Sequence, residues 1–366
     1  MKLKKLTISA ISILLIISMT SLLLVSLISC GEKKDDSADV HVFYYTYSDP
    51  YISTVRAALD KTLSSAGIRY QDHDSNNNQT TQTEQIQTAI TKGAKLLVVN
   101  IVTTGSDDAA KGIIELAKSA GIPLIFFNRE VSSEAIKSYD KSAFIGTDAK
   151  EAGMLQGDMI GDYTVNNFNS MDLNGDGEIS YVLFMGEKGN NEAIYRTQYS
   201  VENANKKLSA AGKKPLKFYD STNTDKYLLD RDGKWSAQAA NEYMTTLLSS
   251  HSTASKNMVE LIICNNDGMA EGAISALNSA GYNTGAEGST TIPVFGVDAT
   301  SAAKELIKDK KMTGTIKQDG DAMAKAIEKA VENGLNSKAL FDGMSDYSID
   351  EGVAKLRIPY AVYLGE

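Results

Sequence analysis

A short acidic segment at residues 172–180 has the side chains and the spacing of a calcium-binding loop. Its sequence, DLNGDGEIS, matches the first nine positions of an EF-hand loop, with side-chain oxygens at positions 1, 3 and 5 and the turn glycine, Gly177, at position 6. The bidentate glutamate expected at position 12 is replaced by Leu183. The segment predicts a structural calcium site whose last carboxylate comes from another part of the chain. The alternative is an Asx-rich turn without metal.

Polar residues also stand where several apolar runs end. Asn100, Asn128 and Asp298 each close such a run, and residues 265–267 (NND) close another. Ligands of open α/β sheets bind beyond the carboxyl ends of the strands, so these side chains are candidates for one binding site. Each of them could instead cap the helix that follows, because Asn and Asp are favoured N-cap residues.

The chain lacks the residue patterns of the common catalytic sites. It contains no G-x-x-x-x-G-K-[ST], G-x-S-x-G or H-E-x-x-H segment, and no G-x-G-x-x-G follows the first apolar run. Histidine, the commonest general base, occurs only at positions 41, 73 and 251. Cys264 lies in the apolar run LIIC, which favours a buried free thiol over a nucleophile. The sequence therefore indicates binding rather than catalysis.

The elements that must position these residues have the pattern of an α/β fold. Short apolar runs alternate with amphipathic stretches, which indicates parallel sheets covered by helices on both faces. The predicted strands are 41–47, 96–102, 122–127, 181–185, 259–264 and 292–297. The predicted helices are 52–65, 107–120, 193–211, 268–280 and 301–308.

Length and charge limit the function further. The chain has 366 residues, which indicates two to three domains, and a formal net charge of −9 at pH 7. Phosphate backbones bind concentrated basic surfaces, so this charge argues against nucleic acid as a partner. A DNA-binding regulator would also need a basic helix-turn-helix before the first predicted strand, and residues 1–40 do not have that pattern.

The first thirty residues have the pattern of a bacterial export leader. Lys2, Lys4 and Lys5 precede an uncharged apolar run to residue 29, and the run ends in LISC at Cys30. This ending resembles the lipobox of bacterial lipoproteins, in which the cysteine is acylated and becomes the first mature residue. We expect a cleaved signal at 1–29, lipidation at Cys30 and a polar tether over 30–39. An uncleaved membrane anchor is the alternative.

From about residue 41 onward, the chain resembles the galactose/glucose-binding periplasmic proteins, which deliver sugar to ABC importers. The segments that carry the resemblance are YSDPYISTVRAAL, IPLIFFNRE, GTDAKEAGMLQGD, MDLNGDGEIS, LIICNNDGMAEGA, IPVFGVDA and LRIPYAVY. It implies a type I periplasmic binding protein, with two Rossmann-like lobes, each a parallel sheet flanked by helices, joined by a three-segment hinge. The N-terminal lobe would comprise 40–146 and about 320–356, and the C-terminal lobe about 147–319 and 357–366.

The resemblance also implies one monosaccharide bound between the lobes. The positions that match the family's sugar ligands are Asp49, Tyr51, Asn128, Asn190, Glu192, Arg196, Trp235, Asn266, Asp298 and Gln318. Tyr51 and Trp235, the only tryptophan, correspond to two aromatic plates that sandwich the sugar. The family has Phe, His, Asp and Asn where this chain has Tyr51, Asn190, Glu192 and Gln318. These four changes leave the sugar's identity open, with glucose and galactose as first choices.

For the calcium loop, the resemblance supplies the missing carboxylate. It implies that Glu260 takes the place of the absent position-12 ligand, and Ser180 stands where the family typically has a glutamine. The implied calcium ligands are Asp172, Asn174, Asp176, Glu178, Ser180 and Glu260.

The function that the resemblance implies is a lipid-anchored substrate-binding protein of a sugar ABC importer. Such a protein would be exported to a bacterial membrane, act as a monomer, and pass its sugar to a membrane permease. The same sugar-bound form could be presented to a chemoreceptor. The alternatives are a sugar- or nucleoside-acting enzyme and a non-transport surface antigen on the same fold.

Overall fold

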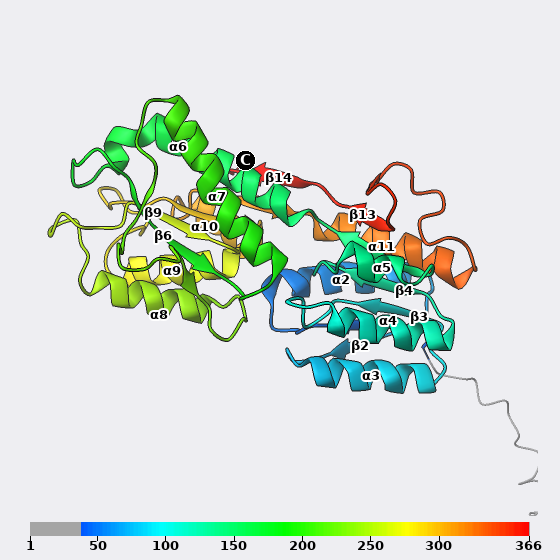
Figure 1. Cartoon of the computed structure of the whole chain (residues 1–366). Helices are drawn as coiled ribbons and strands as arrows, with labels where there is room; N and C mark the ends of the chain where they lie inside the picture. Colours follow the sequence, from blue (N-terminus) through cyan, green and yellow to red (C-terminus); the bar gives the residue numbers. More distant parts are fainter. Residues whose placement is uncertain (1–37, 366) are drawn as a thin grey trace, which may run out of the picture. The chain divides into compact units, whose positions relative to one another are not determined.

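The computed structural model describes residues 38–365 of the chain. It contains two seven-stranded sheets, each covered by helices on both faces, which is the predicted α/β fold of two lobes (Figure 1). The predicted signal, Cys30 and the tether up to residue 37 lie outside the described residues. Between residues 38 and 365, no helix combines the length and the apolar character needed to cross a bilayer.

The first lobe contains a sheet with the strand order β12-β13-β5-β4-β3-β1-β2, in which only β12 and β13 pair antiparallel. Its strands are β1 (Val40–Tyr44), β2 (Tyr70–Asp74), β3 (Leu96–Val99), β4 (Leu124–Phe127), β5 (Ser142–Gly146), β12 (Ser348–Ile349) and β13 (Lys355–Arg357). Its helices are α2 (Pro50–Ser65), α3 (Gln79–Thr91), α4 (Asp108–Ala120), α5 (Ser133–Lys137) and α11 (Gly320–Leu335).

The second lobe has the strand order β14-β11-β10-β9-β6-β7, with β8 also paired to β6 and only β14 antiparallel to its neighbour. Its strands are β6 (Ser180–Met185), β7 (Lys217–Phe218), β8 (Leu228–Leu229), β9 (Leu261–Cys264), β10 (Val294–Asp298), β11 (Gly314–Gln318) and β14 (Tyr360–Tyr363). Its helices are α6 (Ala149–Met171), α7 (Asn191–Ala210), α8 (Ala237–Leu248), α9 (Asp267–Ser279) and α10 (Ser301–Lys308).

Each sheet separates two hydrophobic cores, because successive strand residues point to opposite faces. In β3, Leu96 and Val98 pack with α2 and α11, whereas Leu97 and Val99 pack with α3, α4 and α5. In β9, Ile263 packs with α6 and α7, whereas Cys264 packs with α8 and α9. Cys264 is buried and forms no disulfide, as predicted. Apolar residues on both faces of a strand explain why these runs show no polar alternation in the sequence.

The chain passes between the lobes three times. It leaves the first sheet after Gly146 and enters α6, returns from β11 to α11 around residue 319, and passes from β13 to β14 through residues 358–359. Thr147, Gln318 and Tyr360 therefore lie at these crossings, and hydrogen bonds join them: Thr147 Oγ1 lies 2.8 Å from Tyr360 Oη and 3.1 Å from Gln318 Nε2. The crossings form one bonded cluster rather than three independent linkers.

A stripe of glycines on α6 sets the position of α7. Gly153, Gly157 and Gly161 recur every four residues and face α7. A Cβ at Gly157 would lie 2.5 Å from the carbonyl oxygen of Tyr199 and 2.7 Å from the Cβ of Asn203. Only glycine allows such a close approach of two helix backbones. The spacing matters for function because α7 carries two of the predicted ligand residues.

We predict that Gly157→Ala lowers the melting temperature, because the added methyl group must push α7 away. Overpacking of this kind costs about 1–3 kcal/mol. Gly112→Ala in α4 is the matched control, since a Cβ there meets nothing within 4 Å and alanine favours helix. Circular dichroism melts of the two variants and the wild type test this. Equal melting temperatures for Gly157→Ala and the wild type would contradict the account.

Candidate ligand-binding site

A cavity lies where the carboxyl ends of strands from both sheets meet. All ten residues that the family resemblance assigned to the sugar line this cavity, together with three others. The lining residues are Tyr45, Asp49, Tyr51, Ile52, Asn128, Arg129, Asn190, Glu192, Arg196, Trp235, Asn266, Asp298 and Gln318.

The first lobe positions its lining residues at the start of α2 and the end of β4. Asp49 is the N-cap of α2: its Oδ1 accepts a hydrogen bond from the Ile52 amide at 2.8 Å, and its Oδ2 accepts one from the Tyr45 hydroxyl at 2.5 Å. Asn128 follows β4, where Asn100 Nδ2 donates to its Oδ1 at 3.1 Å. Asn100 does not line the cavity itself, so its role is to orient Asn128.

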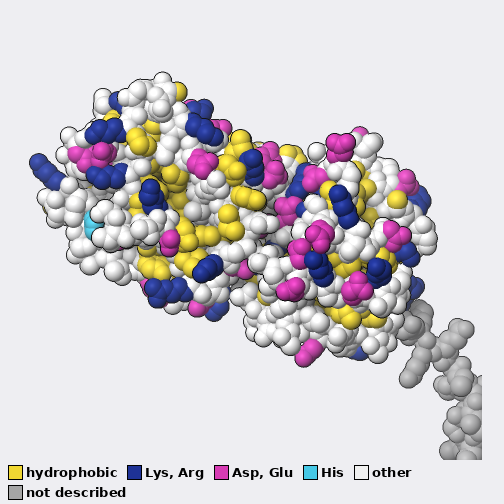
Figure 2. All heavy atoms as spheres, viewed as in Figure 1, with side chains coloured by type: hydrophobic (Ala, Val, Ile, Leu, Met, Phe, Trp, Pro, Cys, Tyr) yellow, Lys and Arg dark blue, Asp and Glu magenta, His cyan; other side chains and the backbone are white. Residues whose placement is uncertain are grey.

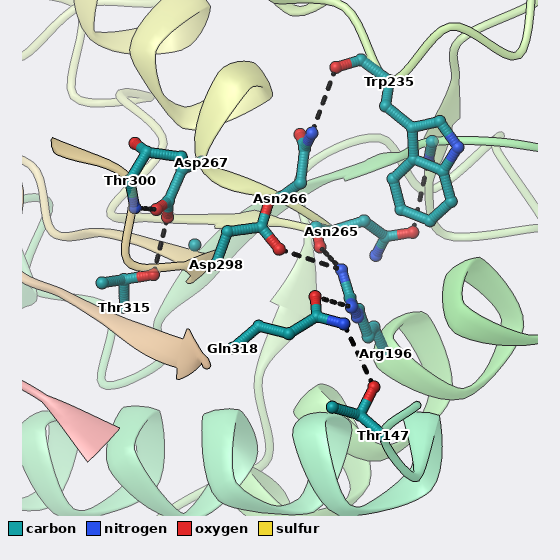
Figure 3. Close-up of polar contacts among 12 residues, drawn as sticks. Thr147, Arg196, Trp235, Asn265, Asn266, Asp267, Asp298, Thr300, Thr315 and Gln318 are labelled. Carbon is teal, nitrogen blue, oxygen red and sulfur yellow. Dashed lines mark hydrogen bonds and ion pairs between the residues drawn. The ribbon is translucent and has the colours of Figure 1, made fainter. Parts of the chain in front are cut away.

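The second lobe positions its residues through helix starts and strand ends. Asn190 and Asn266 are the N-caps of α7 and α9, and Glu192 and Arg196 follow one turn apart on α7. The capping and lining roles weighed against each other from the sequence thus coincide in Asn266. Asn190 and Asp49 likewise both cap a helix and line the cavity. Asp267 lies away from the cavity, where it accepts hydrogen bonds from the Thr300 amide and the Thr315 hydroxyl (Figure 3).

Arg196 is a buried cation among the polar residues that the second lobe contributes to the cavity (Figure 3). Its Nη1 donates to the Asn265 carbonyl oxygen at 2.9 Å and lies 3.9 Å from Asp298 Oδ1. Its Nη2 donates to the Tyr360 hydroxyl at 3.0 Å and to Gln318 Oε1 at 3.4 Å. Burial alone would lower the pKa of Arg196, but Tyr360, Asp298 and Glu192 raise it above its ordinary value. The guanidinium therefore stays charged and fixed in place.

Several polar atoms of the lining residues have no protein partner. The Tyr51 hydroxyl, Glu192 Oε2 and Arg196 Nε are buried without a hydrogen bond. Burial raises the pKa of Glu192 and holds that of Asp298 well above its usual range, with Arg196 acting in the opposite direction for both. Buried polar groups are normally satisfied, and unsatisfied ones require an explanation. A ligand with several hydroxyl groups would supply the missing partners.

Three buried aromatic side chains contribute to the lining, Tyr45 and Tyr51 from the first lobe and Trp235 from the second. Tyr51 belongs to α2, and Trp235 directly precedes the N-cap of α8. The Trp235 indole N–H donates to Glu187 Oε2 at 3.3 Å, and the ring lies where any Cβ on Gly186 would be. Ile52 adds a further apolar surface. The cavity therefore suits a small molecule that has apolar faces and polar edges.

The backbone is strained at three lining residues. Asn128, Trp235 and Asp298 have positive φ angles of 60°, 55° and 127°. Non-glycine residues rarely adopt such angles, and in folded proteins they cluster at functional sites, where the surrounding structure holds them. Residues away from the cavity, such as Lys226, Lys256 and Ser337, also have positive φ angles, so this conformation is not confined to the site.

The predicted calcium loop forms a compact turn between α6 and β6. Asp172 Oδ1 and Oδ2 accept hydrogen bonds from the amides of Gly175 and Gly177 at 2.8 and 2.9 Å. Glu260, far away in sequence, reaches the loop and accepts from the amides of Leu173 and Ser180, both at 2.8 Å. Within residues 38–365, no group of three or more His, Cys, Asp or Glu is already arranged around one metal position. The donor set is nevertheless all oxygen, which is the chemistry that calcium requires.

Sequence reasoning missed three of the lining residues. Ile52 follows Tyr51 directly, and Arg129 follows Asn128 within the segment IPLIFFNRE. Tyr45 fell inside a predicted strand over 41–47, whereas β1 ends at Tyr44. The strand stops there because the Tyr45 amide turns to donate to the side-chain oxygen of Asn100 at 3.3 Å. The one sequence signal for Tyr45 is its position four residues before Asp49, the capping residue to which its hydroxyl donates.

Sugar-binding proteins of other bacteria are similar in sequence to this chain. The D-galactose/methyl-galactoside binding periplasmic protein of Haemophilus influenzae is 35% identical over 322 residues, which cover 88% of each chain. The ribose import binding protein of Salmonella typhimurium is 25% identical and covers 78% of this chain and 81% of its own.

Solved structures show the same fold. An ABC transporter solute binding protein from Clostridium phytofermentans with bound β-D-glucose has a TM-score of 0.68 at 20% identity, covering 88% of this chain and 93% of its own. One from Bacillus halodurans with bound myo-inositol has a TM-score of 0.66 at 22% identity, covering 90% and 95%. A model described as the periplasmic binding protein domain matches residues 40–338. The chain belongs to the periplasmic binding protein family, whose members are solute-binding proteins rather than enzymes.

Proposed function

We propose that this chain is the sugar-binding component of an ABC importer and holds one pyranose in the cavity between Tyr51 and Trp235. The observation that carries the proposal is the set of buried atoms without partners, the Tyr51 hydroxyl, Glu192 Oε2 and Arg196 Nε, in a cavity that also has aromatic side chains. The C–H faces of a pyranose are weakly apolar and suit aromatic rings, while its hydroxyl groups can pair with the polar atoms. The relatives that bind galactosides and ribose support this class of ligand.

The four positions that depart from the family pattern fall into two groups. Asn190 and Gln318 are already held by protein atoms: Asn190 Nδ2 donates to Thr104 Oγ1 at 3.1 Å and its Oδ1 accepts from the Ala193 amide, and Gln318 pairs with Arg196 and Thr147. Tyr51 and Glu192 instead carry atoms without a partner. We infer that Tyr51 and Glu192 decide which sugar is accepted, with glucose and galactose as the first candidates.

A thermal-denaturation panel of glucose, galactose, ribose, xylose, mannose and a nucleoside tests the proposal. Ligand at about a thousand times its dissociation constant adds about 4 kcal/mol, so glucose or galactose should raise the melting temperature by several degrees. Asp298→Asn should weaken binding at least about tenfold, because one side-chain oxygen in the cavity is replaced by an amide nitrogen, which cannot accept a hydrogen bond. Asp162→Asn, at an exposed ion pair with Lys207, is the matched control and should bind normally. No shift with any sugar would contradict the function.

We also propose that the loop at 172–180 binds a calcium ion that stabilises the fold. The residues that would hold it are Asp172, Asn174, Asp176, Ser180, Glu260 and the carbonyl oxygen of Glu178. The position of Glu260 beside the loop supports this proposal, because Glu260 can supply the carboxylate that Leu183, at position 12 of the loop, lacks. Bound calcium would tie α6 to the start of β6 and to the segment before β9.

If the loop binds calcium, chelation with EDTA should lower the melting temperature, because an ion bound only by the native state stabilises it. In Glu260→Gln this difference between calcium and EDTA should shrink. Glu178→Gln is the control: the Glu178 side chain pairs with Lys214 and Lys217 and would not coordinate, so this variant should keep the full difference. Superimposable melts of the wild type in calcium and in EDTA would refute calcium binding.

Membership of this family implies an exported protein. From the leader pattern we propose in addition a lipid anchor at Cys30. From the family resemblance we propose a monomeric state and delivery of the sugar to a membrane permease. The sugar-bound protein could also be presented to a chemoreceptor, and this second use would need no further sugar-binding site. Two-lobed proteins of this kind act by hinged closure around the ligand, which gives both partners a distinct form to recognise.

A further inference from the structure

A partly buried ion pair joins the two lobes beside the cavity. Arg129 follows Asn128 in the first lobe, and Glu187 lies two residues beyond β6 in the second. Arg129 Nη2 lies 2.7 Å from Glu187 Oε2, and the two side chains are 5% and 20% exposed. Burial alone would lower the pKa of Arg129, but the Glu187 carboxylate raises it above its ordinary value. The pair is therefore charged and largely removed from water.

Each partner of this pair also holds a residue that lines the cavity. Glu187 Oε2 accepts the indole N–H of Trp235 at 3.3 Å. The Arg129 guanidinium lies over the ring of Tyr45 at 4.4 Å from its centre, and the Tyr45 hydroxyl donates to Asp49. A continuous series of contacts thus runs from Trp235 in the second lobe to Asp49 in the first.

Other contacts between the lobes lie on the same edge of the cavity. Asn190 Nδ2 donates to Thr104 Oγ1 at 3.1 Å, and the Glu130 amide donates to Glu192 Oε1 at 3.3 Å. Gly105 and Gly189 also approach closely, since a Cβ on Gly189 would lie 3.4 Å from Gly105 Cα. All of these contacts join atoms of the first lobe to atoms of the second.

We propose, on the basis of the sugar-binding function above, that Arg129 and Glu187 are positioning residues that hold the lobes closed and fix Trp235 and Asp49 for the ligand. The pair exists only where the lobes meet, so its interaction favours the closed form and must break before a bound sugar leaves. Removing one partner of such a pair leaves the other charge buried and unpaired, and effects of this kind appear mainly in the dissociation rate.

The single tryptophan makes the proposal measurable in the full-length protein, because all indole fluorescence comes from Trp235. The variants are Glu187→Gln, Arg129→Met and the double variant, with Arg129→Lys as the conservative replacement. Glu187→Gln keeps an acceptor for the indole N–H and removes only the charge. Asp162→Asn and Lys207→Met, at an exposed ion pair within the second lobe, are the matched controls.

Two readouts are needed. In the ligand-free protein, acrylamide should quench Trp235 about twofold more strongly in Glu187→Gln and Arg129→Met than in the wild type or the controls, because Trp235 becomes exposed when the lobes open. With glucose or galactose, stopped-flow release should be about tenfold faster in each single variant, and the double variant should add little to either. Arg129→Lys should restore part of the wild-type rate, since it keeps the charge.

The two proposals fail in different ways. If neither glucose nor galactose binds the wild type, the assigned sugar is wrong, and the quenching comparison still decides the role of the ion pair. If the wild type binds sugar but Glu187→Gln quenches and releases like the wild type, the ion pair does not position the site. Additive effects of the two single variants would also overturn it. The melting temperature of Glu187→Gln is measured as well. If it is close to that of the wild type, a change in quenching or in sugar release does not come from unfolding.

Discussion

The buried charge of Arg196 is the interaction on which the rest of the site depends. A guanidinium removed from water is tolerated only where acceptors surround it, and here they come from the end of β9, from β11 and from β14. Two of these acceptors, Gln318 and Tyr360, sit where the chain passes between lobes. The helix that carries Arg196 can lie this close only because the glycines of α6 leave room for it. Helix packing, hinge and binding site therefore share one group of contacts.

The protein itself leaves several polar atoms around the cavity without a hydrogen-bond partner. Asp298 lies 3.9 Å from Arg196, too far for a hydrogen bond, and Arg196 Nε has no partner at all. Asn128, Trp235 and Asp298, which line the same cavity, have positive φ angles that are uncommon for residues other than glycine. A binding protein needs this arrangement, because groups that were satisfied internally would have no hydrogen-bonding capacity left for a ligand.

Much of this organisation could be predicted from the sequence, and the exceptions have physical reasons. Continuous apolar runs such as LIIC at 261–264 indicate strands buried on both faces, and the polar residues that follow them do gather at one place. Asn100, Asn265 and Asp267 were candidates by the same argument, yet they point to neighbouring protein groups, which spacing along one strand cannot reveal. Arg129 was missed because its pairing with Glu187 depends on the distance between two lobes. Tyr45 was missed because its contacts come from separate segments of the first lobe. The strand expected over 41–47 ends at Tyr44 for a similar reason, a long-range contact with Asn100.

The central claim is that ring hydroxyl groups of a sugar satisfy the unpaired buried atoms of Tyr51, Glu192 and Arg196. The most direct test is calorimetric titration of the protein with whichever of glucose and galactose it binds, and with the monodeoxy analogues of that sugar. We expect removal of a hydroxyl group to weaken binding at least about tenfold at several ring positions, because a buried polar group then loses its partner. Equal affinities for the parent sugar and all of its deoxy analogues would contradict the account.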